Sequence, residues 1–185
     1  MAQGFATGSA ATAILGYIAA VDGELTRRAN WWRPPRWIRV WMICATRGGD
    51  GWLWYATGLL VLLFGGDAKW AAIESAALAS GAGIALFTWL KRRIRRPRPC
   101  SRQAHCWSNI GPPDQFSFPS GHSITAFAVT APLSASYPEL APGFLFCASS
   151  VAASRVLLGM HYLSDVVAGS LIGALLGTAA YCLLA

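Results

Sequence analysis

Charged residues are scarce in this sequence, and the scarcity limits the class of protein that it can encode. Only 12% of the 185 residues are charged, whereas 55% are apolar, a balance too lopsided for an ordinary soluble domain. The chain also lacks internal repeats and low-complexity tracts, and its polar residues are too few to form a separate soluble domain. The composition therefore predicts a membrane protein built as one compact domain.

Closely spaced cysteine pairs are also missing, which argues against a structural zinc site. The five cysteines include no Cys-x-x-Cys pair, the spacing that zinc sites commonly use. Cys100, His105 and Cys106 share one polar loop but lack a fourth ligand, so neither a metal nor another cofactor is expected. A disulfide between Cys100 and Cys106 would require a loop that faces an oxidising compartment, and the sequence leaves this open.

Long apolar stretches make up most of the chain and predict membrane helices. They run at 52–66, 69–90, 122–137, 139–158 and 162–185. Turns at Gly65-Gly66-Asp67, Tyr137-Pro138-Glu139 and Gly159 separate them, except that a long polar loop separates 69–90 from 122–137. Residues 4–21 are a weaker sixth candidate, and because no basic segment or clear cleavage site marks them as a signal peptide, we expect them to be retained. The predicted fold class is therefore all-α, a polytopic membrane bundle of five to six transmembrane helices.

Segment 31–41 mixes tryptophan with arginine, which favours an N-terminal interfacial helix in the headgroup plane. We therefore divide the single domain into an N-terminal apolar and interfacial amphipathic segment, 1–50, and a membrane core, 51–185. The net charge of +7 does not indicate nucleic acid, because the basic residues crowd into 27–47 and 91–102 beside apolar segments and tryptophan. The bilayer and a membrane lipid phosphate are the expected partners, and the oligomeric state stays open.

Three short segments at the edges of apolar stretches combine residues that suit phosphate chemistry. They are Lys91-x6-Arg98-Pro99, Pro119-Ser120-Gly121-His122 and Ser154-Arg155-x5-His161-x3-Asp165. Lys91, Arg98 and Arg155 can neutralise a phosphoryl group, while Ser120 and Gly121 offer a hydroxyl and an unobstructed backbone at a predicted helix start. Because the apolar stretches between these segments cross the bilayer alternately, all three segments should meet at one face.

Two histidines in these segments supply the candidate catalytic groups. His161 and Asp165 are four residues apart, so on a helix they share a face and the carboxylate can orient the imidazole as a nucleophile. His122, on the opposite side of the phosphate, can donate a proton to the leaving oxygen. The neighbouring Arg92, Arg93, Arg95 and Arg96 are interpreted as a charge cluster that sets membrane topology.

At these residues the chain resembles the type 2 phosphatidic acid phosphatase superfamily, whose three-part signature it matches at every position. The resemblance covers about residues 50–185, and the segments at 47–51 and 112–114 also look like small bacterial members. It implies a metal-independent phosphatase of the phosphatidic acid, phosphatidylglycerol phosphate or undecaprenyl pyrophosphate type. It implies a phosphohistidine at His161, oriented by Asp165, with His122 as general acid. The implied phosphate-binding residues are Lys91, Arg98, Ser120, Gly121 and Arg155.

Two other functions fit the residues less well. A vanadate-dependent haloperoxidase uses a similar pocket, but those relatives are larger and soluble. A catalytically silent protein that binds or transports lipid phosphates should have lost His122, His161 or Asp165, and this chain retains all three.

Two indications disagree about which side of the membrane the site faces. Bacterial relatives commonly place it on the periplasmic face of the inner membrane, where we also place this multi-pass protein. Almost every basic residue except Lys69 falls on the motif side, which predicts a cytoplasmic face.

The roles of two acidic residues also stay open. Glu74 is expected to pair with a hydroxyl on a neighbouring helix or to lie near the substrate, and Asp50 is expected to form a turn or to contact the substrate.

Overall fold

The computed structural model describes residues 10–102 and 114–185, and these ranges contain helices and turns but no β-strand. The all-α prediction is therefore confirmed. The helices are α1 (Ala10–Trp31), α2 (Arg36–Arg47), α3 (Leu53–Phe64), α4 (Lys69–Ile94), α5 (Pro99–Arg102), α6 (Gly121–Ser136), α7 (Ala141–Leu157) and α8 (Leu163–Leu184). A π-helical turn, η1 (Gly48–Trp52), joins α2 to α3, and the 3-10 turns η2 (Gly66–Ala68) and η3 (Pro138–Leu140) precede α4 and α7.

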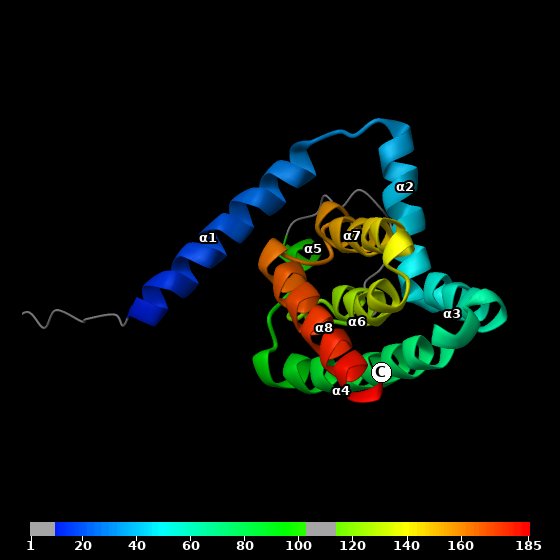
Figure 1. Cartoon of the computed structure of the whole chain (residues 1–185). Coiled ribbons are helices and arrows are strands. Elements are labelled where there is room, and N and C mark those ends of the chain that lie inside the picture. Colours follow the sequence, from blue (N-terminus) through cyan, green and yellow to red (C-terminus); the bar gives the residue numbers. More distant parts are fainter. Residues whose placement is uncertain (1–9, 103–113) are drawn as a thin grey trace, which may run out of the picture.

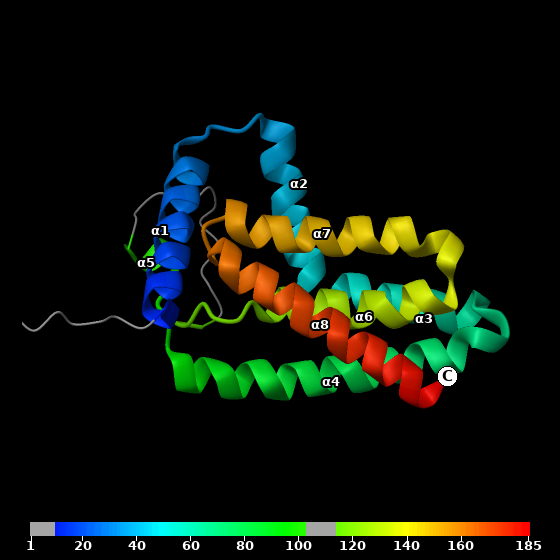
Figure 2. The same cartoon turned by 60° about the vertical axis from the view of Figure 1, so that its left-hand side comes forward.

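The five predicted apolar stretches each form a helix, and four of these helices build the bundle. In Figure 2, α4, α6, α7 and α8 run alongside one another, with α6 enclosed by the other three. The turn between α3 and α4 is held by the Tyr137 hydroxyl, which donates to the carbonyl of Gly65 at 2.9 Å. Short turns of this kind make successive helices antiparallel neighbours.

Three segments in the described part of the chain are long and apolar enough to cross a membrane. They are 66–94, 138–157 and 163–184, which contain α4, α7 and α8. A span needs about 20 residues, and α3 with 12 residues and α6 with 16 are shorter. α1, which contains the described part of the sixth predicted stretch, is not among the three. The prediction of five to six spans therefore stays a prediction.

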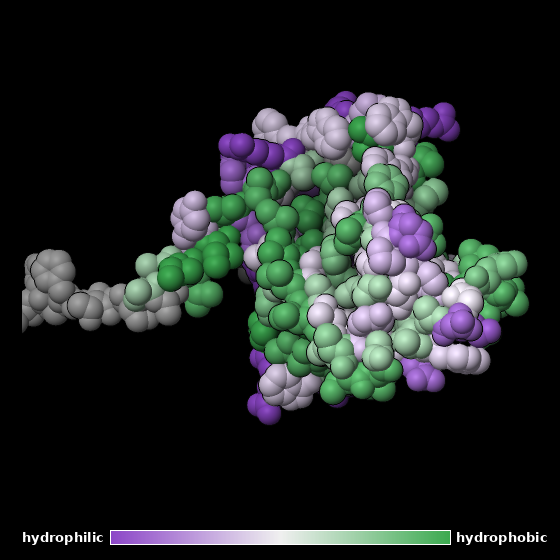
Figure 3. Space-filling model, viewed as in Figure 1, coloured by the Kyte–Doolittle hydropathy of each residue, from purple (hydrophilic) through white to green (hydrophobic). Residues whose placement is uncertain are grey.

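The outer surface of the bundle is apolar, as lipid contact requires. Leu171 and Leu175 of α8 are 61% and 71% exposed, and Leu59, Leu60 and Leu63 of α3 are also exposed. Figure 3 shows this hydrophobic surface over α8, with hydrophilic side chains gathered chiefly at the rim where α1 leads into α2. Such a continuous apolar surface is unusual on a soluble monomer. The chain is a membrane protein.

A row of glycines brings α8 into backbone contact with α6. Gly169, Gly173 and Gly177 repeat every four residues and so lie on one face of α8. A Cβ atom on Gly173 would lie 2.3 Å from the carbonyl oxygen of Ile124, and one on Gly177 would lie 2.7 Å from that of Ala128. Only glycine permits this approach. The row therefore fixes the distance between α6 and α8.

The N-terminal segment differs from the predicted single interfacial helix over 31–41. α1 ends at Trp31, residues 32–35 are not helical, and α2 begins at Arg36. Proline cannot continue a helix because it lacks an amide hydrogen and its ring clashes with the preceding turn, so Pro34 and Pro35 break the segment. α1 crosses the end of the bundle at a steep angle (Figures 1 and 2). On α2, Trp41 stacks on Phe146 of α7 at 5.7 Å between ring centroids.

Candidate active site

The three signature segments lie together at one end of the bundle. α4 and α7 end there, and α6 and α8 begin there, beside α1 and α5 (Figure 2). This is the arrangement that alternating crossings predict. The Ser120 amide donates to the carbonyl of Asp165 at 3.1 Å, so the second and third segments are joined directly.

Arg98 determines which ring nitrogen of His161 carries the proton. The guanidinium of Arg98 is almost fully buried, and its Nη1 lies 2.8 Å from the carbonyl oxygen of Met160 and 2.9 Å from Nε2 of His161. A guanidinium can only donate hydrogen bonds, so Nε2 must accept and the proton of a neutral imidazole must lie on Nδ1. Nε2 therefore carries the lone pair that a nucleophile needs.

His161 and Asp165 are close but do not share a helix, which corrects the geometry expected from their spacing. His161 precedes α8, whereas Asp165 is in its first turn and caps it by accepting the amide hydrogen of Tyr162 at 2.9 Å. The distance from Nδ1 of His161 to Oδ2 of Asp165 is 3.7 Å, longer than a hydrogen bond. The capping turn therefore places the carboxylate of Asp165 opposite the Nδ1 proton of His161, without a direct hydrogen bond between them.

Burial of His161 lowers its pKa well below 6.5, and the cations Arg98, Arg155 and Lys91 lower this pKa further. Imidazole is protonated when the pH lies below its pKa, and a protonated imidazole has no lone pair. We therefore expect the acidic limb that His161 contributes to kcat/KM to lie below pH 6.5. A pH profile of substrate hydrolysis checks this, and an acidic limb at or above pH 7 that persists in His122→Gln would contradict it.

Asp114 bridges two of the three candidate phosphate-binding cations. Its carboxylate accepts from Nζ of Lys91 at 2.7 Å and from Nη2 of Arg98 at 2.8 Å. Burial alone would raise the pKa of Asp114, but these hydrogen bonds lower it to about 2. No role in the site was predicted for Asp114, although its segment 112–114 was noted for its resemblance to bacterial family members. Asp114 offsets one of the two positive charges of Lys91 and Arg98 and holds the two cations close together.

Arg155, the third cation, has hydrogen-bond donors that no described residue uses. Nη1 donates to Oγ1 of Thr46 at 2.5 Å, whereas Nε and Nη2 are buried without a partner in the described residues. Buried donors are nearly always satisfied, and two adjacent guanidinium donors match two oxygens of a phosphoryl group. Thr46 comes from α2 and no sequence signal pointed to it.

The start of α6 has the features expected of an anion site. Ser120 is the N-cap, and its hydroxyl accepts from the amide and hydroxyl of Ser123 at 3.4 and 3.0 Å. Gly121 is the first residue of the helix, and a Cβ there would lie 3.1 Å from the Phe87 ring. The helix begins one residue earlier than expected, and its first amide groups favour negative charge.

His122 has a carboxylate partner from outside the three segments. Its Nε2 lies 2.7 Å from Oδ1 of Asp50 in η1. Gly49 permits this approach, because a Cβ there would lie 2.7 Å from Val151 and 3.2 Å from the His122 ring. Asp50 was expected to form a turn or to contact the substrate. The structure gives it a contact with the candidate general acid.

The basic cluster after α4 contains one residue that the sequence analysis misassigned. Arg92, Arg93 and Arg95 are exposed, as a topology signal would be. Arg96 instead donates to Oδ1 of Asp165 at 2.6 Å, so its interpretation as a topology signal alone is wrong.

Other predicted features lie apart from this arrangement. Glu74 is exposed on α4 rather than packed against a neighbouring helix. Residues 10–102 and 114–185 contain no group of three or more His, Cys, Asp or Glu side chains arranged to hold a metal ion. Cys106, and with it the disulfide to Cys100, lies outside the described residues.

Comparison with known proteins agrees with the resemblance seen in the sequence. Residues 70–185 match the PAP2 superfamily. The chain belongs to the PAP2 superfamily. Two solved structures have folds similar to that of this chain. The structure of Aquifex aeolicus LpxE has a TM-score of 0.71 at 24% identity and covers 85% of this chain and 92% of its own. The structure of a transmembrane phosphatidylglycerolphosphate phosphatase from Bacillus subtilis has a TM-score of 0.65 at 24% identity, and the match covers 90% of this chain and 86% of that chain.

Curated relatives of this PAP2 chain include two kinds of lipid phosphatase. A lipid A 1-phosphatase from Rhizobium johnstonii is 32% identical over 69% of this chain and 59% of its own length. A decaprenylphosphoryl-5-phosphoribose phosphatase from Mycolicibacterium smegmatis is 34% identical over 55% of this chain and 52% of its own length. One from Mycobacterium tuberculosis is 32% identical over 75% of this chain and 78% of its own length. The chain thus spans between half and three fifths of the length of the first two relatives.

Proposed function

We propose that the protein is an integral-membrane phosphatase that hydrolyses a lipid phosphate or a prenyl (di)phosphate through a phosphohistidine at His161. The observation that carries the proposal is the position of Nε2 of His161. It accepts a hydrogen bond from Arg98 and lies among cations that include Arg155, whose unused donors suit a phosphoryl group. A lone pair surrounded by phosphate-binding donors is the arrangement required for attack on phosphorus.

The proposed reaction has two displacement steps. When the phosphoryl group enters, Arg98 moves its hydrogen bond from Nε2 of His161 to a phosphoryl oxygen, which frees the lone pair of Nε2. Nε2 then attacks phosphorus, the bond to the leaving oxygen breaks, and protonated His122 gives its proton to that oxygen. Lys91, Arg98 and Arg155 stabilise the phosphoryl oxygens, and Asp165 faces the Nδ1 proton of the imidazolium that forms. Water then attacks phosphorus as His122 takes its proton, the bond between phosphorus and Nε2 breaks, and inorganic phosphate leaves with His161 restored.

An apolar cavity beside the site supports a lipid substrate. It has a volume of about 400 Å³ and lies between α3, α4 and α6, where its walls include Trp54, Ile73, Ile84 and Val129. Asp50, the partner of His122, lines the same cavity. A hydrocarbon chain can therefore lie among apolar side chains while the phosphate that it carries reaches the site.

The relatives suggest which lipid phosphates to test first. Their names specify lipid A and a decaprenyl-linked sugar phosphate, and both are phosphates on a membrane lipid. We therefore add these two classes to phosphatidic acid, phosphatidylglycerol phosphate and undecaprenyl pyrophosphate. Inorganic phosphate release is measured with protein purified in detergent, with and without EDTA, and with vanadate as inhibitor. We expect release from at least one class, unaffected by EDTA and inhibited by vanadate. Release from none, or activity lost in EDTA, would overturn the proposal.

We infer that the protein lies in a bacterial inner membrane with this site on the periplasmic side. Cys100 follows the first signature segment and is partly exposed, so it reports on this end of the bundle. An impermeant thiol reagent should label Cys100 in intact, reduced cells, and Cys100→Ser should lose that label. Labelling of Cys100 only after lysis would place the site in the cytoplasm.

A further inference from the structure

Asp22 of α1 is a buried acidic residue that lies outside the part of the chain that matches the PAP2 superfamily. It is only 3% exposed, and its carboxylate accepts from the amide of Ser164 at 3.0 Å and from the Ser164 hydroxyl at 2.5 Å. A buried carboxylate is costly unless it is paired and hydrogen-bonded. The bonds to Ser164 compensate this burial and attach α1 to the start of α8.

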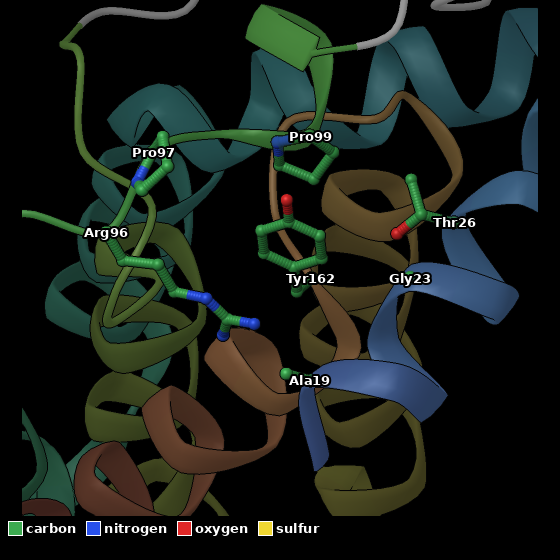
Figure 4. Close-up of a pocket in the computed structure, with 7 residues that line it drawn as sticks. All are labelled: Ala19, Gly23, Thr26, Arg96, Pro97, Pro99 and Tyr162. Atoms are coloured by element: carbon green, nitrogen blue, oxygen red, sulfur yellow. The ribbon is translucent and has the colours of Figure 1, made fainter. Parts of the chain in front are cut away.

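Arg96 connects Asp22 to the candidate catalytic carboxylate. Nη2 of Arg96 lies 2.8 Å from Oδ2 of Asp22, and Nη1 lies 2.6 Å from Oδ1 of Asp165. The guanidinium also lies 4.1 Å from the centre of the Tyr162 ring. Figure 4 shows Arg96 extending from the loop after α4 towards α1 and the first turn of α8. One cation thus joins carboxylates from the first and last helices.

The charges of Asp22, Arg96 and Asp165 depend on one another. Burial alone would lower the pKa of Arg96, but its bonds to Asp22 and Asp165 raise that pKa, so the guanidinium stays charged. Asp165 is fully buried, and removal of its cationic partner would leave a buried charge uncompensated. Its Oδ2 is held by the Tyr162 amide and its Oδ1 by Arg96. Arg96 therefore fixes the second oxygen, and Asp22 fixes Arg96.

We propose that Asp22 and Arg96 are positioning residues that hold Asp165 towards His161, which makes α1 a working part of the active site. The proposal rests on the proposed phosphatase function. Neither residue belongs to the set expected to contact phosphate. Their loss should therefore slow the chemical step and leave substrate binding nearly intact.

The test compares kcat and KM for hydrolysis of the best lipid phosphate by full-length variants. Arg96→Met should lower kcat at least about 30-fold, and Asp22→Asn about 5- to 10-fold, with KM changed less than about 3-fold because Lys91, Arg98 and Arg155 remain. Arg96→Lys should be intermediate, since one ammonium cannot bridge both carboxylates as a guanidinium does. The Asp22→Asn, Arg96→Met double variant should lose clearly less than the product of the two single losses, because Asp22 acts partly through Arg96 and partly through its direct bonds to Ser164.

Glu24→Gln is the matched control. It removes the same charge from the same helix, but within the described residues Glu24 forms its ion pairs with the exposed Arg27 and Arg28 on the surface of α1. It should keep the kcat and KM of the original protein. An equal loss in Glu24→Gln and Asp22→Asn, or an unchanged kcat in both Asp22→Asn and Arg96→Met, overturns the inference.

Hydrogen exchange separates this inference from the proposed function. Faster exchange in Asp22→Ala, confined to peptides that cover 160–168, supports the link between α1 and the start of α8 even if no substrate is hydrolysed. Exchange that rises across the whole bundle, or that does not change at 160–168, contradicts it. Absence of phosphate release by the unaltered protein refutes the phosphatase function alone.

Discussion

His161→Ala is expected to abolish phosphate release, with kcat/KM falling at least about 10³-fold. The reason is geometric, because Nε2 of His161 accepts a hydrogen bond from Arg98 at 2.9 Å and therefore carries its lone pair among the phosphate-binding cations. The measurement is inorganic phosphate release from the best lipid phosphate, together with transfer of radiolabelled phosphate to the protein. A phosphohistidine should be lost in acid and retained in base.

His161→Ala should still bind inorganic phosphate, since Lys91, Arg98 and Arg155 are unchanged and hold its oxygens without a bond to His161. This binding is the control that the variant remains folded. His122→Ala offers a further comparison, because loss of a general acid slows release without removing the nucleophile. Labelled protein that persists in His161→Ala would refute the nucleophile assignment, and so would retained activity.

Gly173→Ala is expected to have the second largest effect, on stability and activity together. A Cβ at this position would lie 2.3 Å from the carbonyl oxygen of Ile124, so α8 must move away from α6. Overpacking of this kind typically costs about 1–3 kcal/mol. Because the Ser120 amide bonds to the Asp165 carbonyl across the same helix pair, the shift also separates the second and third signature segments. Thermal unfolding in detergent and phosphate release measure the two effects.

Gly81→Ala is the matched control for this substitution. Gly81 lies within α4, and a Cβ there would have no neighbour within 4 Å. Alanine is favoured over glycine in a helix by about 1 kcal/mol, so Gly81→Ala should leave stability unchanged or raise it. Equal stability of Gly173→Ala and Gly81→Ala would show that the contact between α6 and α8 is less tight than the structure indicates.

The helices of this protein follow from the sequence because lipid contact leaves a strong local signal. Each apolar stretch forms a helix, and the turns fall at Gly65, Pro138 and Gly159 as the sequence indicates. The spacing of the three signature segments also predicts that they meet at one end. These conclusions need only local composition and alternate crossing of the bilayer.

The partners of the candidate catalytic residues could not be predicted, because they are distant in sequence. Arg96 and Asp22 are 74 residues apart, Arg155 and Thr46 are 109 apart, and His122 and Asp50 are 72 apart. The N-terminal member of each pair carries no local pattern that marks its contact. Only the packing of α1, α2 and η1 against the bundle determines which side chains they present.

Two local interpretations failed for identifiable reasons. The aromatic and basic pattern of 31–41 suggested one helix, but the backbone restriction of Pro34 and Pro35 outweighs that pattern. The four-residue spacing of His161 and Asp165 suggested a shared helix, but α8 starts at Leu163. Asp165 instead caps that helix, and the turn before it brings His161 near the carboxylate.

The apolar cavity between α3, α4 and α6 also determines how substrate concentration should be expressed. A lipid whose chain lies in this cavity can remain in the bilayer, so its encounters with the protein depend on its mole fraction in the membrane or detergent micelle. The rate at a fixed bulk amount of lipid should therefore fall as inert detergent or lipid is added. KM values for different substrates become comparable only when each is stated as a surface mole fraction.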